Sequence, residues 1–399
     1  MIKHCRALFS VSLPLLMAGT ALPSFAQSGS TAPWVGTWAT PPENMGSGFG
    51  QVTVREFVHT SVGGTAARIR LSNEFGTDPL VVQDIHIARR NPAVSGGIMA
   101  GTDHAMTFSG STSVTIPVGA VAISDPVAMT VPALSDISVS FFLPASGFTA
   151  VTGQNATFFK PSFLASGDVS GATTLPAGTT TQPISFFLDG LDVQGTTTAG
   201  AVVALGASIT GGVGSDEDLN DRWTDVLAQR LSKAGMSVGV LNSGISGDNS
   251  LNDAGGPNGQ RRFNGDVTAQ AGVEWVMISD FPINNFGSTP ATAADPIASL
   301  KQFIARAHER KIKVLCADLT PFKGSSGWTA DGESGREAYN AFVLGGTSGC
   351  DGTVDVASAV SDPKNPQQYL PAFDSGDHLH PNAAGHAAIG NAINLALFH

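Results

Sequence analysis

The sequence predicts an all-β sandwich domain followed by an α/β domain built on a parallel sheet. Before about residue 198, short segments alternate apolar and polar residues with a period of two. After it, continuous apolar runs alternate with segments of helical period. The chain has 399 residues, which is long enough for two domains with cores of their own. We therefore expect the two domains at 27–197 and 198–399.

The first domain has the pattern of a β-sandwich. Alternating segments occur at Val52–Val58, Ala67–Leu71 and Ile137–Phe141, and turn sequences rich in Gly, Pro and Asp separate them. Regularly spaced alternating strands with such turns are typical of two packed antiparallel sheets. No segment of helical period and useful length occurs in this part of the sequence.

The second domain alternates strands with helices. Its apolar runs predict strands at Ala201–Leu205, Val238–Leu241, Trp275–Ile278, Ile312–Leu315 and Val354–Val356. Helical spacing predicts three helices: one over Trp223–Leu231 capped by Asn220 or Asp221, one opened by Asp295 and Pro296, and one from about Asn382. This alternation predicts a parallel sheet with helices on both faces.

Composition and charge narrow the possible partners. Hydrophobic residues make up 42% of the chain and charged residues 13%, which indicates a folded protein. Acidic residues outnumber basic ones, 32 against 21, for a net charge of −11. Nucleic acids and anionic membranes attract proteins in which basic residues outnumber acidic ones, so we expect neither as a partner.

The first 26 residues have the features of a signal peptide. Lys3 and Arg6 precede an apolar stretch, Ala7–Leu22, and small residues stand at the cleavage positions of Ser24–Ala26. The alternative is a membrane anchor, but Gly19 and the shortness of the stretch disfavour it. We expect cleavage near Ala26, no stable membrane insertion, and a secreted or periplasmic protein.

Motifs for metal, nucleotide and redox chemistry are absent from the sequence. It contains no Gly-Lys pair of a P-loop, no HExxH and no CxxC. Cys5 would leave with the signal peptide, so Cys316 and Cys350 remain and could form a disulfide in an oxidising compartment. Whether they pair is left open by the sequence. We expect no metal and no cofactor.

A serine follows the first strand of the α/β domain. Ser208 lies in Leu205–Gly212, a glycine-rich segment at the carboxyl end of that strand, where open α/β sheets bind ligands. If a helix begins here, its free N–H groups would favour negative charge near Ser208. The alternative is an ordinary serine in a connecting loop.

A candidate base and its carboxylate partner precede the last helix. Serine is a weak nucleophile that needs a base, usually a histidine oriented by a carboxylate. Asp377 and His380 provide both from one loop. The alternative is that Asp377 caps the final helix. We interpret His378 and His386 as surface residues.

Four segments of the second domain resemble the SGNH hydrolases, also called GDSL esterases and lipases. They are Gly206–Ile209, Asn242–Asp248, Pro282–Asn285 and Asp377–His380, in the order that the family has. The resemblance implies a flavodoxin-like three-layer hydrolase fold and a serine esterase. It assigns Ser208, Asp377 and His380 to a catalytic triad, and Ser208, Gly247 and Asn284 to an oxyanion hole.

The N-terminal region resembles the branch of this superfamily in which a β-sandwich precedes the hydrolase domain. Trp34–Trp38 and Arg70–Gly76 carry that likeness. Three positions depart from the family pattern: Ala207 stands where Asp is usual, Pro282 where Gly is usual, and Asn285 where Asp is usual. Ala207 and Asn285 thus remove two carboxylates close to the expected site, and Pro282 lacks an N–H group.

The expected function is hydrolysis of short-chain acyl esters, acetyl esters on carbohydrate in particular. The substrate would be a small-molecule or glycan ester, and Trp328, in a Gly- and Ser-rich loop, is a candidate for stacking on a sugar ring. One alternative is a non-catalytic ligand-binding protein that retains the fold. Another is a lipolytic esterase, which would expose an apolar patch near the site. The oligomeric state is not predicted.

Overall fold

The computed structural model describes residues 32–155, 160–195, 199–287 and 292–399. Within it, Ala32–His399 form one compact unit. The expected signal peptide lies outside the described residues, and so does the domain boundary expected near residue 198. None of the helices in the described ranges is long and apolar enough to cross a membrane.

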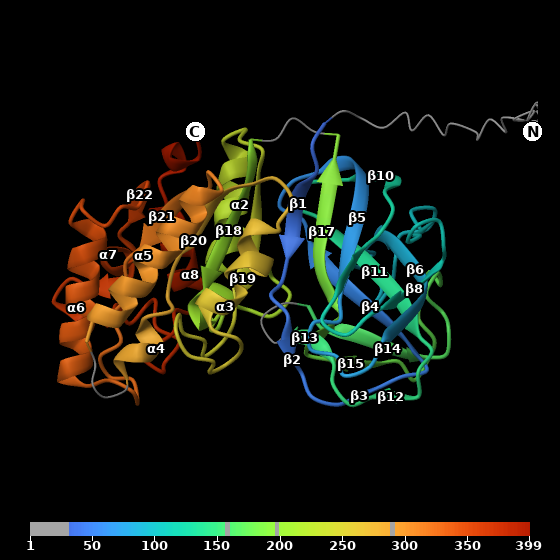
Figure 1. Cartoon of the computed structure of the whole chain (residues 1–399), viewed down its shortest axis with the longest axis horizontal. Helices are drawn as coiled ribbons and strands as arrows, with labels where there is room; N and C mark the ends of the chain where they lie inside the picture. Colours follow the sequence, from blue (N-terminus) through green and yellow to red (C-terminus); the bar gives the residue numbers. More distant parts are fainter. Residues whose placement is uncertain (1–31, 156–159, 196–198, 288–291) are drawn as a thin grey trace, which may run out of the picture. The chain divides into compact units, whose positions relative to one another are not determined.

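Two antiparallel sheets dominate the β-rich region, residues 32–195 (Figure 1). The first sheet is built from β1 (Val35–Ala39), β17 (Leu188–Gln194), β5 (Gly64–Ser72) and β10 (Val127–Val131), with β9 (Val121–Ile123) beside β5. The second sheet is built from β15 (Thr180–Gln182), β14 (Ser162–Ser166), β4 (Val52–His59), β11 (Asp136–Leu143), β6 (Leu80–Arg89) and β7 (His104–Ala105), with β8 (Ser113–Ile116) beside β6. Five short strands form two further small sheets: β2 (Glu43–Asn44), β3 (Gly48–Phe49), β12 (Gly147–Phe148), β13 (Thr152–Asn155) and β16 (Ile184–Phe186).

The alternating segments of the sequence are strands, as predicted. Val52–Val58, Ala67–Leu71 and Ile137–Phe141 lie within β4, β5 and β11. Apolar residues of both large sheets, among them Ile69 and Val139, are buried in the same core. The described residues before 196 contain no helix. The region is therefore all β, because alternation gives each strand one apolar face to bury.

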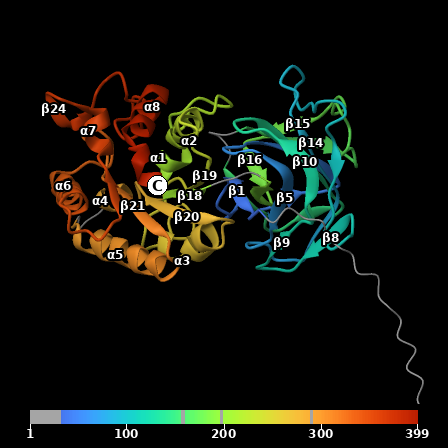
Figure 2. The same ribbon diagram turned by 90° about the horizontal axis from the view of Figure 1, so that it is seen from above.

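A parallel sheet forms the centre of the α/β region, residues 199–399 (Figure 2). Its strands are, in spatial order, β19 (Val238–Gly244), β18 (Gly200–Gly206), β20 (Val273–Ile278), β21 (Lys313–Ala317) and β22 (Gly352–Val354). All five predicted strands are confirmed. The last one ends at Val354, because the side chain of Asp355 caps the short helix α7 (Val356–Val360).

Helices cover both faces of this sheet. Val202 and Ala204 of β18 pack in a core with residues of α2 (Trp223–Lys233) and α8 (Ala383–Ala392). Val203 and Leu205, which point to the other face, pack in a core with residues of α5 (Ala294–Glu309). Figure 2 shows α2 and α8 on one side of the strands, with α3 (Gly259–Phe263) and α5 on the other. The three-layer arrangement is confirmed.

The predicted helix starts differ from those observed. Helix α2 is capped by Arg222, not by Asn220 or Asp221. Asp225 accepts hydrogen bonds from the backbone N–H and from the side chain of Arg222, and the two residues form a capping box. Helix α5 begins at Ala294, so Asp295 lies in its first turn, where its negative charge interacts favourably with the positive end of the helix dipole. Helix α6 (Ala330–Leu344) was not predicted, since its buried face includes Gly335 and charged residues that hide the apolar period.

Cys316 and Cys350 form a disulfide bond, which answers the question that the sequence left open. The bond joins β21, the neighbour of the edge strand β22, to the segment before β22. Contacts also tie the β-rich region to the α/β region. The Ser61 hydroxyl accepts a hydrogen bond from Val240 N–H of β19 at 2.9 Å, and Gly36 N–H of β1 donates to Ala271 O at 2.9 Å.

Candidate active site

Ser208, His380 and Asp377 form a continuous hydrogen-bonded relay. Ser208 opens the one-turn helix α1 (Ser208–Gly211), directly beyond β18. Its Oγ lies 2.9 Å from His380 Nε2, and His380 Nδ1 lies 2.6 Å from Asp377 Oδ2. The structure thus brings together, from positions 172 residues apart, the three residues that the sequence singled out.

The electrostatics of the relay suit proton transfer from Ser208. Partial burial tends to raise the pKa of Asp377, but hydrogen bonds from the His380 side chain and from the N–H groups of His380 and Leu379 lower it to about 2. Asp377 is therefore ionised at neutral pH and fixes the proton of His380 on Nδ1. The Nε2 atom is then free to accept the proton of Ser208, whose side chain is buried.

The loop before α8 leaves Asp377 available for His380. Helix α8 is capped by Asn382 and not by Asp377. The side chain of Asn382 accepts a hydrogen bond from Gly385 N–H at 3.0 Å. The possibility that Asp377 caps the final helix is therefore wrong. His378 is exposed, as predicted, and its Nδ1 atom lies 2.5 Å from Asp374 Oδ2.

His386 is buried, so its interpretation as a surface residue is wrong. It is fully inaccessible to solvent and lies on α8, on the side that packs against α2. Its Nε2 atom donates to Val213 O at 3.0 Å, and its Nδ1 atom accepts from Trp223 N–H at 3.4 Å. Only the neutral ring satisfies both partners, and burial lowers the pKa of His386 to about 4.

Asp280 is a residue of the site that sequence reasoning missed. It follows β20 and is 5% exposed, and its carboxylate reaches the backbone of the nucleophile turn. Oδ1 accepts from Ala207 N–H at 3.0 Å, and Oδ2 accepts from Ile209 N–H at 2.8 Å. A helix does begin at Ser208, and Asp280 supplies the negative charge that its N–H groups were expected to favour, because it accepts those on either side of Ser208. A carboxylate directly after a buried strand was the available signal.

Hydrogen bonds hold the segments that carry Gly247 and Asn284, the two expected oxyanion donors outside the nucleophile turn. Gly247 has φ +75°, and Asp248 N–H bonds to Ile245 O at 3.1 Å, as in a type II turn that favours glycine at this position. Asn284 lies in α4 (Ile283–Phe286), and its Nδ2 atom donates to Asp248 O at 2.6 Å. The second Nδ2 hydrogen remains for a ligand. In the described chain, the N–H groups of Ser208 and Gly247 have no hydrogen-bond acceptor.

A buried arginine connects the nucleophile strand to the Gly247 loop. Arg262 Nη2 donates to Gly206 O at 2.8 Å, and its Nε atom donates to Asp248 Oδ2 at 2.9 Å. Burial raises the pKa of Asp248 to about 7, against the opposing influence of the Arg262 charge. Because one guanidinium holds both segments, the spacing between Ser208 and Gly247 is fixed from behind the site.

Trp328 does not contact the relay in the described structure. Its ring is half-buried, its Nε1 atom donates to Glu333 Oε2 at 3.2 Å, and Lys323 Nζ lies 5.4 Å from the ring centre. The same loop passes beside His378, because a Cβ atom at Gly324 would lie 3.0 Å from the His378 ring. A role for Trp328 in substrate binding stays a prediction.

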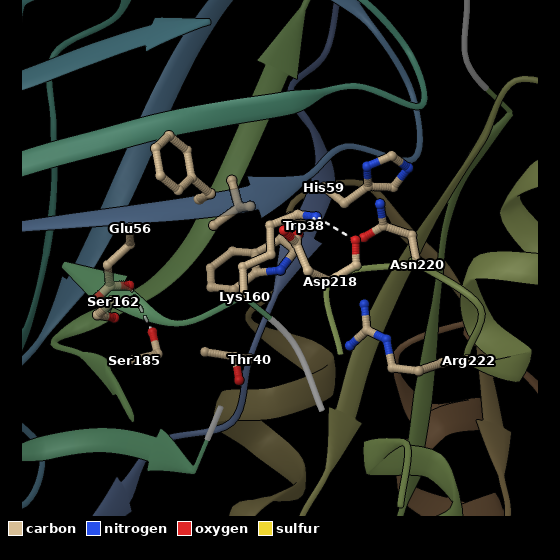
Figure 3. Close-up of a pocket in the computed structure, with 12 residues that line it drawn as sticks. Trp38, Thr40, Glu56, His59, Lys160, Ser162, Ser185, Asp218, Asn220 and Arg222 are labelled. Atoms are coloured by element: carbon tan, nitrogen blue, oxygen red, sulfur yellow. Dashed lines mark hydrogen bonds and ion pairs between the residues drawn. The ribbon is translucent and has the colours of Figure 1, made fainter. Parts of the chain in front are cut away.

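A second charged cluster lies around Lys160, where the β-rich region meets the segment between α1 and α2 (Figure 3). Lys160 is hydrogen-bonded to Asp218 and lies 3.2 Å from Asp136, and Arg90 pairs with Asp218 at 2.7 Å. The cavity here measures about 30 Å³, enough for water but too small for an ester substrate. We interpret this cluster as structural. No group of side chains suited to holding a metal ion is found in the described ranges.

Comparisons with known proteins agree with this geometry. Residues 204–388 match the model of the GDSL-like lipase/acylhydrolase family. No curated protein sequence matches the chain.

Similar solved structures each cover about half of this chain. A lipase/acylhydrolase from Enterococcus faecalis is 20% identical, with 48% of this chain and 92% of that chain covered and a TM-score of 0.37. An alpha/beta hydrolase enzyme from the metagenome of Lake Arreo, Spain, is 22% identical, covering 51% and 96%, with a TM-score of 0.39. An acetyl xylan esterase from Geobacillus stearothermophilus is 18% identical, covering 50% and 95%, with a TM-score of 0.39. The α/β region therefore carries a GDSL-like lipase/acylhydrolase domain, which supports a serine ester hydrolase of the SGNH type, and a β-rich region precedes this domain.

Proposed function

We propose that this protein is an exported esterase that removes short acyl groups, acetyl in particular, from carbohydrate hydroxyls. The relay from Asp377 through His380 to Ser208, with distances of 2.6 and 2.9 Å, is the observation that carries the catalytic part of the proposal. Trp328, in the loop beside His378, is the candidate contact for a sugar ring.

In the proposed mechanism, Ser208 Oγ attacks the ester carbonyl carbon while His380 Nε2 takes its proton. The N–H groups of Ser208 and Gly247 and the amide of Asn284 donate to the oxyanion that forms. His380 then gives the proton to the leaving alcohol, and an acyl-enzyme on Ser208 remains. Water attacks this acyl group with the same base, which releases the acid and restores Ser208.

The distribution of exposed apolar side chains supports a short acyl group. A lipolytic enzyme needs an apolar surface next to its nucleophile. The large apolar side chains exposed in the described residues are Met99, Val118, Val121, Ile123, Leu219, Leu251 and Leu344. None of them lies in the four segments that carry the relay and the oxyanion donors, which favours small acyl groups over long chains.

The decisive experiment is hydrolysis of p-nitrophenyl acetate, butyrate and octanoate by the wild type, Ser208→Ala and His380→Ala. We expect the highest kcat/KM for acetate and its loss in both variants. Activity that rises toward octanoate would identify a lipolytic esterase instead. Tight ligand binding without turnover, unchanged by Ser208→Ala, would identify a non-catalytic binding protein.

Export is tested separately by N-terminal sequencing of the protein secreted by a bacterial host. A mature chain beginning at Gln27 would support the proposed cleavage after Ala26. A chain recovered only in the cytoplasm with its first 26 residues intact would contradict it.

A further inference from the structure

A polar cavity of about 260 Å³ lies between the β-rich region and the loop that carries Gly247. Glu43 and Asn44 of β2, with Met45 beside them, and Gln154 of β13 line it from the β-rich region. The backbone of the α/β region, including Gly244 of β19, lines the other side. It is far larger than the roughly 30 Å³ that a single water takes in the liquid.

The cavity adjoins the proposed catalytic centre. Ser246, which lines it, is the residue before Gly247, so their Cα atoms are about 3.8 Å apart. Gly211, which also lines it, is three residues beyond Ser208 in helix α1, a rise of about 4.5 Å along the axis. The cavity wall therefore continues along the chain into both segments that carry the proposed catalytic groups, while Ser208, Gly247 and His380 themselves are not among its described lining residues.

Gln154 presents an unsatisfied acceptor in the wall of this cavity. The residue is 3% exposed, and its Nε2 atom donates to Gly244 O at 2.7 Å. Because a carbonyl oxygen accepts only from a donor, this bond fixes which end of the amide is nitrogen. The Oε1 atom is buried and finds no donor in the described part of the chain. A buried acceptor without a donor is unfavourable, and a ligand hydroxyl that displaced the atoms covering Oε1 would satisfy it.

The other groups of the cavity indicate what kind of ligand it suits. Besides amides, it has the side chains of Glu43 and Ser246, and Met45 provides its apolar side chain. Among the described residues that line it there is no lysine, arginine or histidine, so a phosphate or carboxylate would find no charge partner in them. Burial raises the pKa of Glu43 to about 7, against the Arg262 charge, so this carboxyl exists partly as a neutral donor near neutral pH.

We propose that this cavity is a subsite for the alcohol portion of the ester, and that it takes a neutral sugar whose hydroxyl donates to Gln154 Oε1. The proposal rests on the esterase function proposed above. It gives the β-rich region a function in catalysis, because β2 and β13 form one wall of the substrate site.

The test compares two acetyl esters that differ only in their alcohol. For each protein we would measure kcat/KM for monoacetylated xylobiose and for p-nitrophenyl acetate, and take their ratio. Gln154→Met keeps the length of the side chain but removes the acceptor, together with the Nε2 donor to Gly244 O, and we expect it to lower the ratio about tenfold. Gln83→Met, at an exposed position of β6, is the matched control and should keep the wild-type ratio. A ratio unchanged in Gln154→Met would overturn the proposal.

A second variant and an inhibition assay test the same subsite without relying on correct folding of the Gln154→Met protein. Asn44→Ala, at an exposed residue of the same cavity, should lower the same ratio, and unmodified xylobiose should inhibit p-nitrophenyl acetate hydrolysis by the wild type competitively. Lack of inhibition together with an unchanged ratio would refute the sugar subsite while leaving the esterase intact. Wild-type protein that hydrolyses neither ester would instead refute the proposed function.

Discussion

The carboxylate of Asp280 accepts a hydrogen bond from Ile209 N–H at 2.8 Å and another from Ala207 N–H at 3.0 Å. Its Oδ1 atom also accepts the Thr210 hydroxyl at 2.6 Å. The backbone on both sides of Ser208 is therefore fixed, while the Ser208 N–H group between them has no acceptor among the described residues and is available for the proposed oxyanion. Asp280 thus brings a carboxylate to a turn where Ala207 has none of its own.

Replacing Asp280 with Asn should reduce turnover more than substrate binding. The amide end of Asn would face N–H donors, so the turn that carries Ser208 would shift. We expect kcat to fall about 10–100-fold with KM changed little, since misplacement by about 1 Å can cost 10²-fold. The measurement is steady-state kinetics on p-nitrophenyl acetate. A thermal unfolding temperature that drops while kcat stays at the wild-type value would show that Asp280 only stabilises the fold.

Asp377→Asn should cost far more activity than Asp374→Asn. Each aspartate is bonded to a histidine in the same loop, but only the Asp377 pair ends at a serine. Asparagine at 377 would favour the wrong tautomer of His380, and we expect kcat to fall by about 10²–10⁴. Asp374→Asn is the matched control, with an expected loss of no more than about threefold. Equal losses in the two variants would argue against the assigned relay.

Asn284→Ala should lower kcat by about 10²–10³, the usual effect of removing one oxyanion donor. The 2.6 Å bond from Asn284 to Asp248 O fixes the amide, so its second hydrogen is oriented before substrate arrives. Asn284→Asp, which replaces the donor by a negative charge at the same size, should be at least as damaging. Wild-type kcat in both variants would remove Asn284 from the oxyanion hole.

His386 should make the fold sensitive to acid. Its folded pKa of about 4 lies below the usual 6.5, so between these values the unfolded chain binds a proton that the folded chain does not. Stability from the neutral ring is thus present above pH 6.5 and is lost as pH falls toward 4. His386→Gln removes the titration but can keep both hydrogen bonds.

The free energy of unfolding, measured with urea at pH 7 and pH 4.5 for wild type and His386→Gln, checks this expectation. The wild type should lose about 2 kcal/mol relative to the variant between these pH values. Buried carboxyl groups with raised pKa values, such as that of Asp318, are common to both proteins and cancel in the comparison. A difference independent of pH would mean that His386 titrates alike in both states.

Residues whose partners follow from a strand or loop pattern could be predicted from the sequence. The apolar run at Ala201–Leu205 predicted β18, and the chain direction of a parallel strand then placed Ser208 at its carboxyl end. The short loop from Asp377 to His380 restricted their separation enough to predict contact. These inferences depend on local geometry, which a sequence specifies directly.

The remaining features depend on which segments pack together. Asp280 and Ile209 are 71 residues apart, and only the order β18 beside β20 brings that carboxylate to the nucleophile turn. His386 is buried because α8 packs on α2, whereas its own polar, alanine-rich neighbourhood resembles a surface. The sequence by itself determined the strand and helix periods, the four segments and their order. The tertiary structure decided burial, hydrogen-bond partners and the cavity beside Gly247, because these are set by contacts between residues far apart in the chain.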